Sequence, residues 1–70
     1  MKVFFSKHAR IRLRERGISK NEVFEGIESP DHAYKKHGKL YFQKGLQRGK
    51  IEFICEKKTD YLKVITVYWL

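Results

Sequence analysis

The sequence predicts an α+β domain in which two N-terminal helices pack on one face of a three- to four-stranded antiparallel sheet. Three observations lead to this prediction. Helix-capping residues bracket two segments within residues 7–29, the apolar period changes to two from residue 31 onward, and turn residues separate the β-prone runs that follow. Seventy residues hold one such core and leave none for a second, so we expect residues 1–70 to form a single domain.

The first segment is short and apolar (residues 1–5), which fits an edge strand or a packed arm. We expect a helix at residues 7–16, because Ser6 is a favourable N-cap and Gly17 suits the left-handed position that ends a helix. The apolar stripe of this helix consists of Ala9 and Leu13.

A second helix is expected to end before Ser29 and Pro30. Ser19 and Glu22 have the S-x-x-E spacing of a capping box that opens it. One side of this helix is apolar and the other is acidic: Val23, Phe24 and Ile27 against Glu22, Glu25 and Glu28. The acidic side is most simply a solvated face.

Four runs with β-strand character follow, at residues 32–36, 40–44, 51–57 and 61–69. Alternation in the third run divides it into two faces: Ile51, Phe53 and Cys55 on one, Glu52, Ile54 and Glu56 on the other. The last run is apolar on both faces and is expected to be an interior strand.

The net charge of +8, from 16 Lys and Arg against 8 Asp and Glu, is unevenly distributed. It is +5 in residues 1–16, −3 in 17–32, +6 in 33–50 and zero in 51–70. Basic blocks attract phosphate backbones, so we expect a nucleic-acid partner. A membrane partner is not expected, because the basic helix has no broad apolar face to insert.

Cysteine usage and size set further limits. Cys55 is the single cysteine, which excludes a disulfide scaffold, and its apolar strand face favours a buried structural thiol. Since nothing resembles a signal peptide or a spanning helix, we expect a cytoplasmic protein. A domain this small buries little core, which favours a protein partner or a homodimer.

One helix face carries the strongest candidate for chemistry. His8, Arg12 and Arg16 share a stripe at i, i+4 and i+8. Cleavage of RNA through the ribose 2′-hydroxyl needs a base, positive charge at the phosphorane and an acid, which imidazole and guanidinium groups supply. From spacing alone, a docked histidine and surface arginines remain the simpler interpretation. The histidines lack metal-ligand spacing, so neither a metal site nor a cofactor is expected.

Aromatic side chains form the other candidate group. Tyr41, Tyr61, Tyr68 and Trp69 lie in predicted strands, where they can stack on bases but more often contribute packing. Thr66 and Tyr68 share a strand face that can form the floor of a site beneath the first helix.

Several motifs together resemble a known domain. They are H-A-R-I-R-L-R-E-R-G-I-S from His8 to Ser19, then Val23, Ile27 and Pro30, then G-K-L-Y and a closing V-I-T-V-Y. This pattern resembles a small bacterial and archaeal domain with an H-A-x-x-R-[ML]-x-x-R-G-I helix, which is similar to RelE-like and BrnT-like toxins and grouped with the barnase, EndoU and colicin nuclease fold. The resemblance extends from about His8 to Tyr68.

The resemblance implies a metal-independent endoribonuclease, often the toxin of a toxin–antitoxin pair. His8 then acts as general base or acid, Arg12 and Arg16 hold the scissile phosphate, and Tyr68, supported by Thr66, positions the substrate or donates a proton. Further basic residues are expected to bind RNA: Arg10, Arg14, Lys35, Lys36, Lys39 and Lys44.

Two other functions stay open. The same basic blocks suit a non-catalytic nucleic-acid-binding domain in which His8 is structural. The chain also suits a protein-interaction module that docks a partner such as an antitoxin through its acidic helix or its sheet edge.

Overall fold

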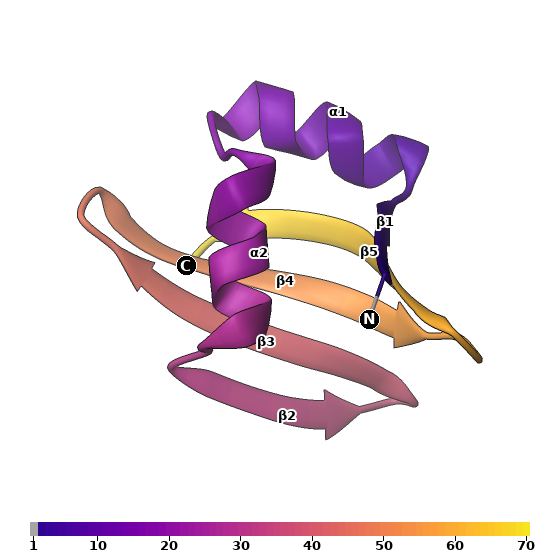
Figure 1. The fold of residues 1–70 in the computed structure, drawn as a ribbon. Helices are drawn as coiled ribbons and strands as arrows, with labels where there is room; N and C mark the ends of the chain where they lie inside the picture. Colours follow the sequence, from indigo (N-terminus) through magenta and orange to yellow (C-terminus); the bar gives the residue numbers. More distant parts are fainter. Residues whose placement is uncertain (1) are drawn as a thin grey trace.

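A computed structural model describes residues 2–70 and shows two helices with a five-stranded mixed sheet (Figure 1). The elements are β1 (Lys2–Phe5), α1 (Lys7–Arg16), α2 (Lys20–Glu28), β2 (His32–Lys36), β3 (Lys39–Leu46), β4 (Gly49–Lys57) and β5 (Tyr61–Trp69). The strand order is β1-β5-β4-β3-β2. Strand β1 runs parallel to β5, and the other neighbours are antiparallel.

The α+β class with two helices is confirmed, and the four strands that follow the helices pair antiparallel as predicted, but the predicted sheet is incomplete. A fifth strand, β1, precedes the helices and pairs in parallel with β5. Its register joins Val3 to Leu62 and Phe5 to Val64, across almost the whole chain. Local periodicity carries no information about such a distant partner, so a four-residue apolar segment could only be described as a strand or an arm.

Both helix starts form as predicted. The Ser6 hydroxyl accepts a hydrogen bond from the backbone N–H of Ala9 at 3.0 Å, and Gly17 ends α1 with φ 64°. At the start of α2, Ser19 and Glu22 exchange both capping-box bonds, at 3.1 and 2.9 Å. These ends are local, since each uses residues three apart, and for that reason the sequence predicts them well.

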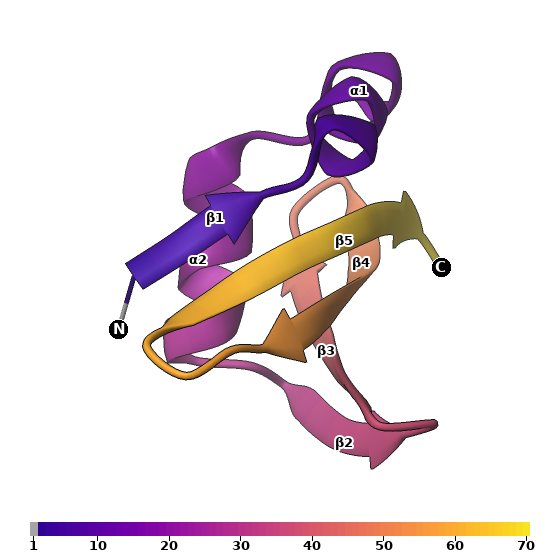
Figure 2. The ribbon, with the colours of Figure 1, turned by 90° about the vertical axis from the view of Figure 1, so that its right-hand side faces the viewer.

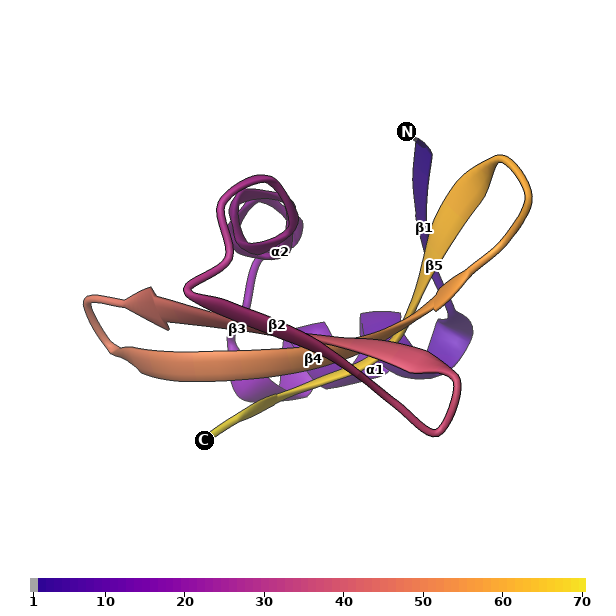
Figure 3. The same cartoon turned by 90° about the horizontal axis from the view of Figure 1, so that it is seen from below.

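The two helices occupy different places on the sheet. Helix α2 covers one face, whereas α1 lies along the side of β5, above the end of β1 (Figure 2). Seen along α2, the opposite face of the sheet has no helix over it (Figure 3). No helix within residues 2–70 is long and apolar enough to span a membrane.

Helix α1 completes the edge of the sheet that β1 begins. Strand β1 pairs only with the first part of β5, and the side chains of Ser6 and of Arg16 in α1 bind β5 carbonyls beyond that part. The Ser6 hydroxyl donates to the Ile65 carbonyl at 3.0 Å, although the two residues are 59 positions apart, and Arg16 Nη1 donates to the Val67 carbonyl at 2.6 Å. In return, Trp69 Nε1 donates to the Arg16 carbonyl at 2.9 Å. The exposed edge of β5 is thereby satisfied without another strand.

Arg48 joins the turn between β3 and β4 to the junction of the two helices. Its guanidinium binds both carboxylate oxygens of Glu22, at 2.6 and 2.8 Å, and the Gly17 carbonyl at 2.8 Å. It also lies 5.2 Å from the ring centroid of Trp69. The backbone N–H of Ser19 and then Arg48 lower the pKa of Glu22. This acid is therefore a structural partner and not only part of a solvated face.

The core lies between the helices and the covered face of the sheet. Its buried side chains are Ala9, Leu13, Ile18, Val23, Ile51, Phe53, Cys55, Leu62, Val64 and Val67. The predicted burial of Cys55 is confirmed, and burial raises the pKa of its thiol to about 12. A thiol that stays protonated is a packing group and not a nucleophile.

A glycine allows α2 to lie directly on the core. A Cβ atom at Gly26 would be 2.7 Å from Cε1 of Phe53 and 3.3 Å from Cβ of Lys44. The centre of a helix normally disfavours glycine. Here the missing side chain sets the distance between α2 and the sheet.

We expect Gly26→Ala to lower the free energy of unfolding. Overpacking a core costs about 1–3 kcal/mol, and the contact with the Phe53 ring places this site toward the upper end, above the roughly 1 kcal/mol that alanine gains in helix propensity. Urea unfolding followed by circular dichroism measures the change. The matched control is Glu25→Ala on the exposed side of α2, expected within about 0.5 kcal/mol of the parent. A higher urea midpoint for Gly26→Ala would contradict the packing argument.

Candidate functional site

The face of the sheet without a helix, here named the open face, carries polar and aromatic side chains from four strands. Strand register arranges them in three rows across the sheet. The rows are Tyr68, Glu52, Gln43 and His32; then Thr66, Ile54, Tyr41 and Tyr34; then Lys63, Glu56, Lys39 and Lys36. Along β2, β3 and β4 these residues alternate with the side chains that face the helices. Where β5 pairs with β4, the register shifts between Ile54 and Cys55, so that two residues, Val64 and Ile65, separate Lys63 from Thr66.

A buried carboxylate lies in the first row. Glu52 is only 6% exposed, and three side chains from three other strands donate to it. The Tyr34 hydroxyl and Gln43 Nε2 bind Oε2 at 2.9 and 2.8 Å, and the Tyr68 hydroxyl binds Oε1. A buried charge is tolerated only when hydrogen bonds replace its hydration, and this network provides them.

The network fixes the protonation states of its members. Burial alone would raise the pKa of Glu52, but the hydrogen bonds from Tyr68, Gln43 and Tyr34, together with the nearby charge of Lys36, hold it below its ordinary value. Burial and the bond to Glu52 raise the pKa of Tyr68, and the bond to Glu52 raises that of Tyr34. At neutral pH the site therefore combines an ionised carboxylate with protonated phenols.

The raised pKa of Tyr68 bears on the two roles that the resemblance implies for it, positioning of the substrate and donation of a proton. A phenol with a raised pKa is a weaker acid, and its proton is engaged with Glu52. The geometry therefore supports a positioning role for Tyr68 over proton donation. Thr66 lies in the neighbouring row, opposite Ile54.

Sequence reasoning missed Glu52, Gln43 and Tyr34 as a unit. The alternation of residues 51–57 places Glu52 on the correct face but gives it no partner. The sequence does show an acid, Glu52, between the apolar residues Ile51 and Phe53. An acid in such a place requires hydrogen-bond donors from neighbouring strands. Identifying those donors needs the register of four strands.

The stripe on α1, formed by His8, Arg12 and Arg16, runs beside β5. Arg16 binds the Val67 carbonyl, and Arg12 pairs with Glu15 at 2.5 Å. Since Arg16 lies on the flank of α1 that adjoins β5, the helical repeat places Arg12 and the exposed His8 one and two turns earlier on that flank. Within residues 2–70 no hydrogen bond joins this stripe to Thr66 or Tyr68.

The other basic residues are distributed over several surfaces. Arg10 and Arg14 are exposed on a different side of α1. Lys36 and Lys39 lie on the open face, and Lys39 pairs with Glu56 at 3.0 Å.

Lys35 and Lys44 point to the opposite side of the sheet, because they alternate with the open-face residues. Lys44 Nζ binds the Ser29 carbonyl at 2.8 Å and lies 4.0 Å from Asp31. This places a cation at the carboxyl end of α2, where the helix dipole favours it. The four predicted RNA-binding lysines are thus divided between two faces.

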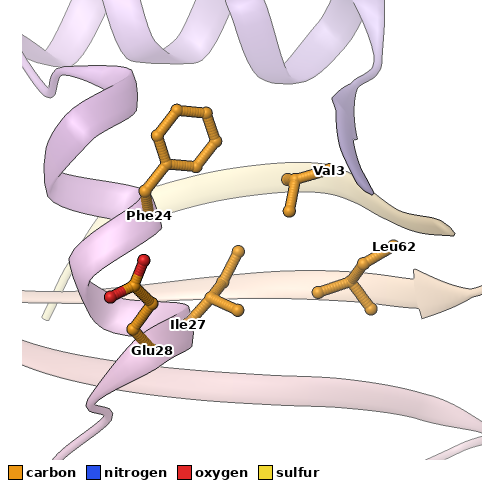
Figure 4. Close-up of a pocket in the computed structure, with 5 residues that line it drawn as sticks. All are labelled: Val3, Phe24, Ile27, Glu28 and Leu62. Atoms are coloured by element: carbon orange, nitrogen blue, oxygen red, sulfur yellow. The ribbon is translucent and has the colours of Figure 1, made fainter. Parts of the chain in front are cut away.

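A pocket between α2 and β1 lies on the helix side of the sheet and not on the open face (Figure 4). Its walls are Val3, Phe24, Ile27, Glu28 and Leu62. Ile27 and Leu62 face each other across it, and Glu28 is its charged member. It contains none of the predicted site residues. Nor do residues 2–70 contain a group of three or more His, Cys, Asp or Glu side chains suited to hold a metal ion.

We expect Glu52→Gln to destabilise the fold at neutral pH by about 1.5–3 kcal/mol, the typical contribution of hydrogen bonds to a charged group. The folded pKa of Glu52 is lowered, so its contribution is present above the unfolded pKa and is lost as pH falls through the folded pKa. The difference between parent and variant should therefore shrink below about pH 4. Urea unfolding at pH 7 and pH 3 tests this. Glu56→Gln, which removes a surface partner of Lys39, serves as control and should change stability less.

Comparison with known proteins places the chain in a family. Residues 5–69 match the model of DUF4258, a domain of unknown function. No curated protein and no solved structure matches the chain. The matched range contains both helices, the strands β2 to β5 and every residue of the open face. The chain therefore belongs to the DUF4258 family.

Proposed function

We propose that this chain is a metal-independent endoribonuclease that acts in the cytoplasm as the toxin of a toxin–antitoxin pair. One observation supports it most. The helix stripe of His8, Arg12 and Arg16 runs along the strand whose open-face side chains are Thr66 and Tyr68. These are the two sets of residues that the RelE-like and BrnT-like resemblance implies. They are distant in sequence and neighbours in the fold.

In the proposed reaction a base removes the proton of a ribose 2′-hydroxyl, whose oxygen attacks the adjacent phosphorus. The bond to the 5′-oxygen breaks, and an acid protonates that oxygen. The products are a 2′,3′-cyclic phosphate and a 5′-hydroxyl end. His8 performs one of the two proton transfers, since its exposed imidazole can accept or donate a proton at a ring nitrogen.

The arginines stabilise the charge that develops on the phosphate. Arg12 reaches the phosphate by exchanging its surface contact with Glu15 for a stronger acceptor. Arg16 uses one N–H for the Val67 carbonyl, and a guanidinium has further donors available. Tyr68 and Glu52 form the fixed floor beside them and act as positioning residues.

An antitoxin, or a second copy of the chain, has free sheet edges on which to dock. Strands β1 and β2 are the two ends of the sheet order, so each has one edge without a strand partner among residues 2–70. An added strand from a partner would pair with such an edge through its main chain. Growth arrest on expression, relieved by a partner protein, would support the toxin assignment.

A second candidate function is a non-catalytic nucleic-acid-binding domain. The engagement of the Tyr68 hydroxyl with Glu52 favours it, because that phenol proton is then not available for a second proton transfer beside His8. This candidate predicts binding that weakens with salt and yields no cleavage products.

We expect His8→Ala to slow RNA cleavage by about 10²- to 10⁴-fold, the usual contribution of a general acid or base. Purified protein incubated with a labelled single-stranded RNA and resolved on a gel provides the measurement. The control is His37→Asn, which removes another imidazole at an exposed turn where φ is 53° and asparagine is tolerated. Equal rates for the parent and His8→Ala would exclude the catalytic role.

We further expect EDTA to leave the cleavage rate unchanged, because the nucleophile is a ribose hydroxyl and the charges come from arginine. A substrate with a 2′-deoxyribose at the cleaved position should resist the enzyme. Mass spectrometry of the fragments should detect the 2′,3′-cyclic phosphate. Inhibition by EDTA, or fragments with a 5′-phosphate, would contradict this mechanism.

A further inference from the structure

Three aromatic rings meet on the open face at the far side of the sheet from α1. The rings of Tyr34 and Tyr41 stack across β2 and β3, with centroids 5.0 Å apart and planes inclined by 15°. The His32 ring lies 5.3 Å from that of Tyr34, inclined by 41°. We refer to these three residues as the aromatic cluster.

The aromatic cluster is held in place before any ligand binds. The Tyr34 hydroxyl donates to Glu52, which fixes one ring, and Tyr41 stacks directly on that ring. Neither helix covers this face (Figure 3). His32 is exposed. Rings that are already ordered lose little conformational entropy when a flat ligand stacks on them.

Other aromatic rings of residues 2–70 lie away from the aromatic cluster, including that of Phe4, which is exposed on β1 and packs on Tyr61. Trp69 lies under the Arg48 guanidinium and donates its N–H to Arg16. Phe42 and Phe53 stack on the helix side of the sheet. The aromatic cluster is thus the group of rings beside the buried carboxylate on the side of β3, whereas Tyr68 adjoins the same carboxylate from β5.

The charge around the aromatic cluster favours a polyanion. The negative charge of Glu52 is buried beneath its three donors, and Glu56 is neutralised by Lys39 and by Lys58, whose Nζ lies 3.6 Å away. Lys36 shares the strand of Tyr34, two residues further on, and lies on the same face. Asp31, which precedes His32, accepts from the backbone N–H of Gly45 and lies 4.0 Å from Lys44 Nζ. The charge that remains next to the rings is therefore the positive charge of Lys36.

Flat rings beside cations fit one class of ligand best. Unpaired nucleobases stack on aromatic side chains while lysines contact the phosphates, an arrangement that needs no particular base sequence. A protein docking surface would instead gather apolar groups with few charges at its centre. Here a carboxylate and its polar donors lie next to the rings.

We propose that the aromatic cluster of His32, Tyr34 and Tyr41 is a stacking site for an unpaired base of single-stranded RNA, with Lys36 at the adjoining phosphate. The choice of RNA rests on the proposed ribonuclease function. Since neighbouring strands are about 4.8 Å apart, β2 and β3 lie roughly 10–15 Å from β5 across the sheet. The stacked base and the phosphate at α1 therefore belong to different nucleotides of one strand.

The test measures binding of an uncleavable ligand, so that affinity is separated from catalysis. The probe is a fluorescent single-stranded oligoribonucleotide with 2′-O-methyl groups throughout, titrated at low salt and followed by anisotropy. Tyr41→Leu is expected to weaken binding by about 5- to 100-fold, the loss of one base stack. His32→Ala changes an exposed side chain that the fold does not need, and a smaller loss in the same direction is expected.

Two controls assign the loss to stacking. Tyr61→Leu makes the same chemical change at a tyrosine that packs on Phe4, away from the aromatic cluster, and should bind like the parent. An oligomer of the same length with abasic sites should bind the parent more weakly than the complete oligomer does. Its affinities for the parent and for Tyr41→Leu should be equal.

The proposal fails if both variants bind like the parent, if Tyr61→Leu loses as much as Tyr41→Leu, or if the abasic oligomer binds as tightly as the complete one. A lack of any oligonucleotide binding would also overturn it and would favour a protein partner. Failure of the ribonuclease function has a different signature. In that case RNA stays intact while binding still depends on Tyr41.

Discussion

The buried charge of Glu52 is the constraint on which the open face depends. A carboxylate at the centre of β4 requires donors, and Tyr34, Gln43 and Tyr68 supply them from β2, β3 and β5. Breaking such a set by removing one partner leaves a charge or a donor unpaired, which costs more than a single exposed hydrogen bond. The same carboxylate therefore specifies the strand register, fixes two tyrosine rings and keeps their phenols protonated.

Helix α1 adds a second constraint at the opposite edge of the sheet. Ser6 and Arg16 both serve backbone carbonyls of β5, and Ser6 also caps the helix. A helix fixed by such contacts cannot rotate about its axis without losing them. The orientation of His8 relative to the sheet is therefore set by Ser6 and Arg16. This explains how an exposed side chain can still have a defined position.

The parts of this fold that the sequence predicts are the local ones. Caps at Ser6, Gly17 and Ser19 involve residues within one helical turn, and the alternation of residues 51–57 needs no partner. The parallel pairing of β1 with β5 joins segments almost the whole chain apart, and nothing in Lys2–Phe5 identifies that partner. The stripe on α1 could be read from helical spacing, whereas the set around Glu52 depends on the register of four strands. The placement of Lys35 and Lys36 on opposite faces of the sheet follows from strand alternation alone and could be predicted from the sequence.

The parallel pairing of the first strand with the last also orders events during synthesis. Strand β1 is made before its partner β5, residues 61–69, so the growing chain holds an unpaired apolar segment while the residues between them are translated. Helix α1 is in the same position, because the carbonyls that Ser6 and Arg16 bind belong to β5. The junction of α1 with the sheet therefore assembles only after β5 has left the ribosome, and incomplete chains cannot contain it. Under the proposed ribonuclease function, this delay would prevent incomplete chains from cleaving the messenger RNA that encodes them.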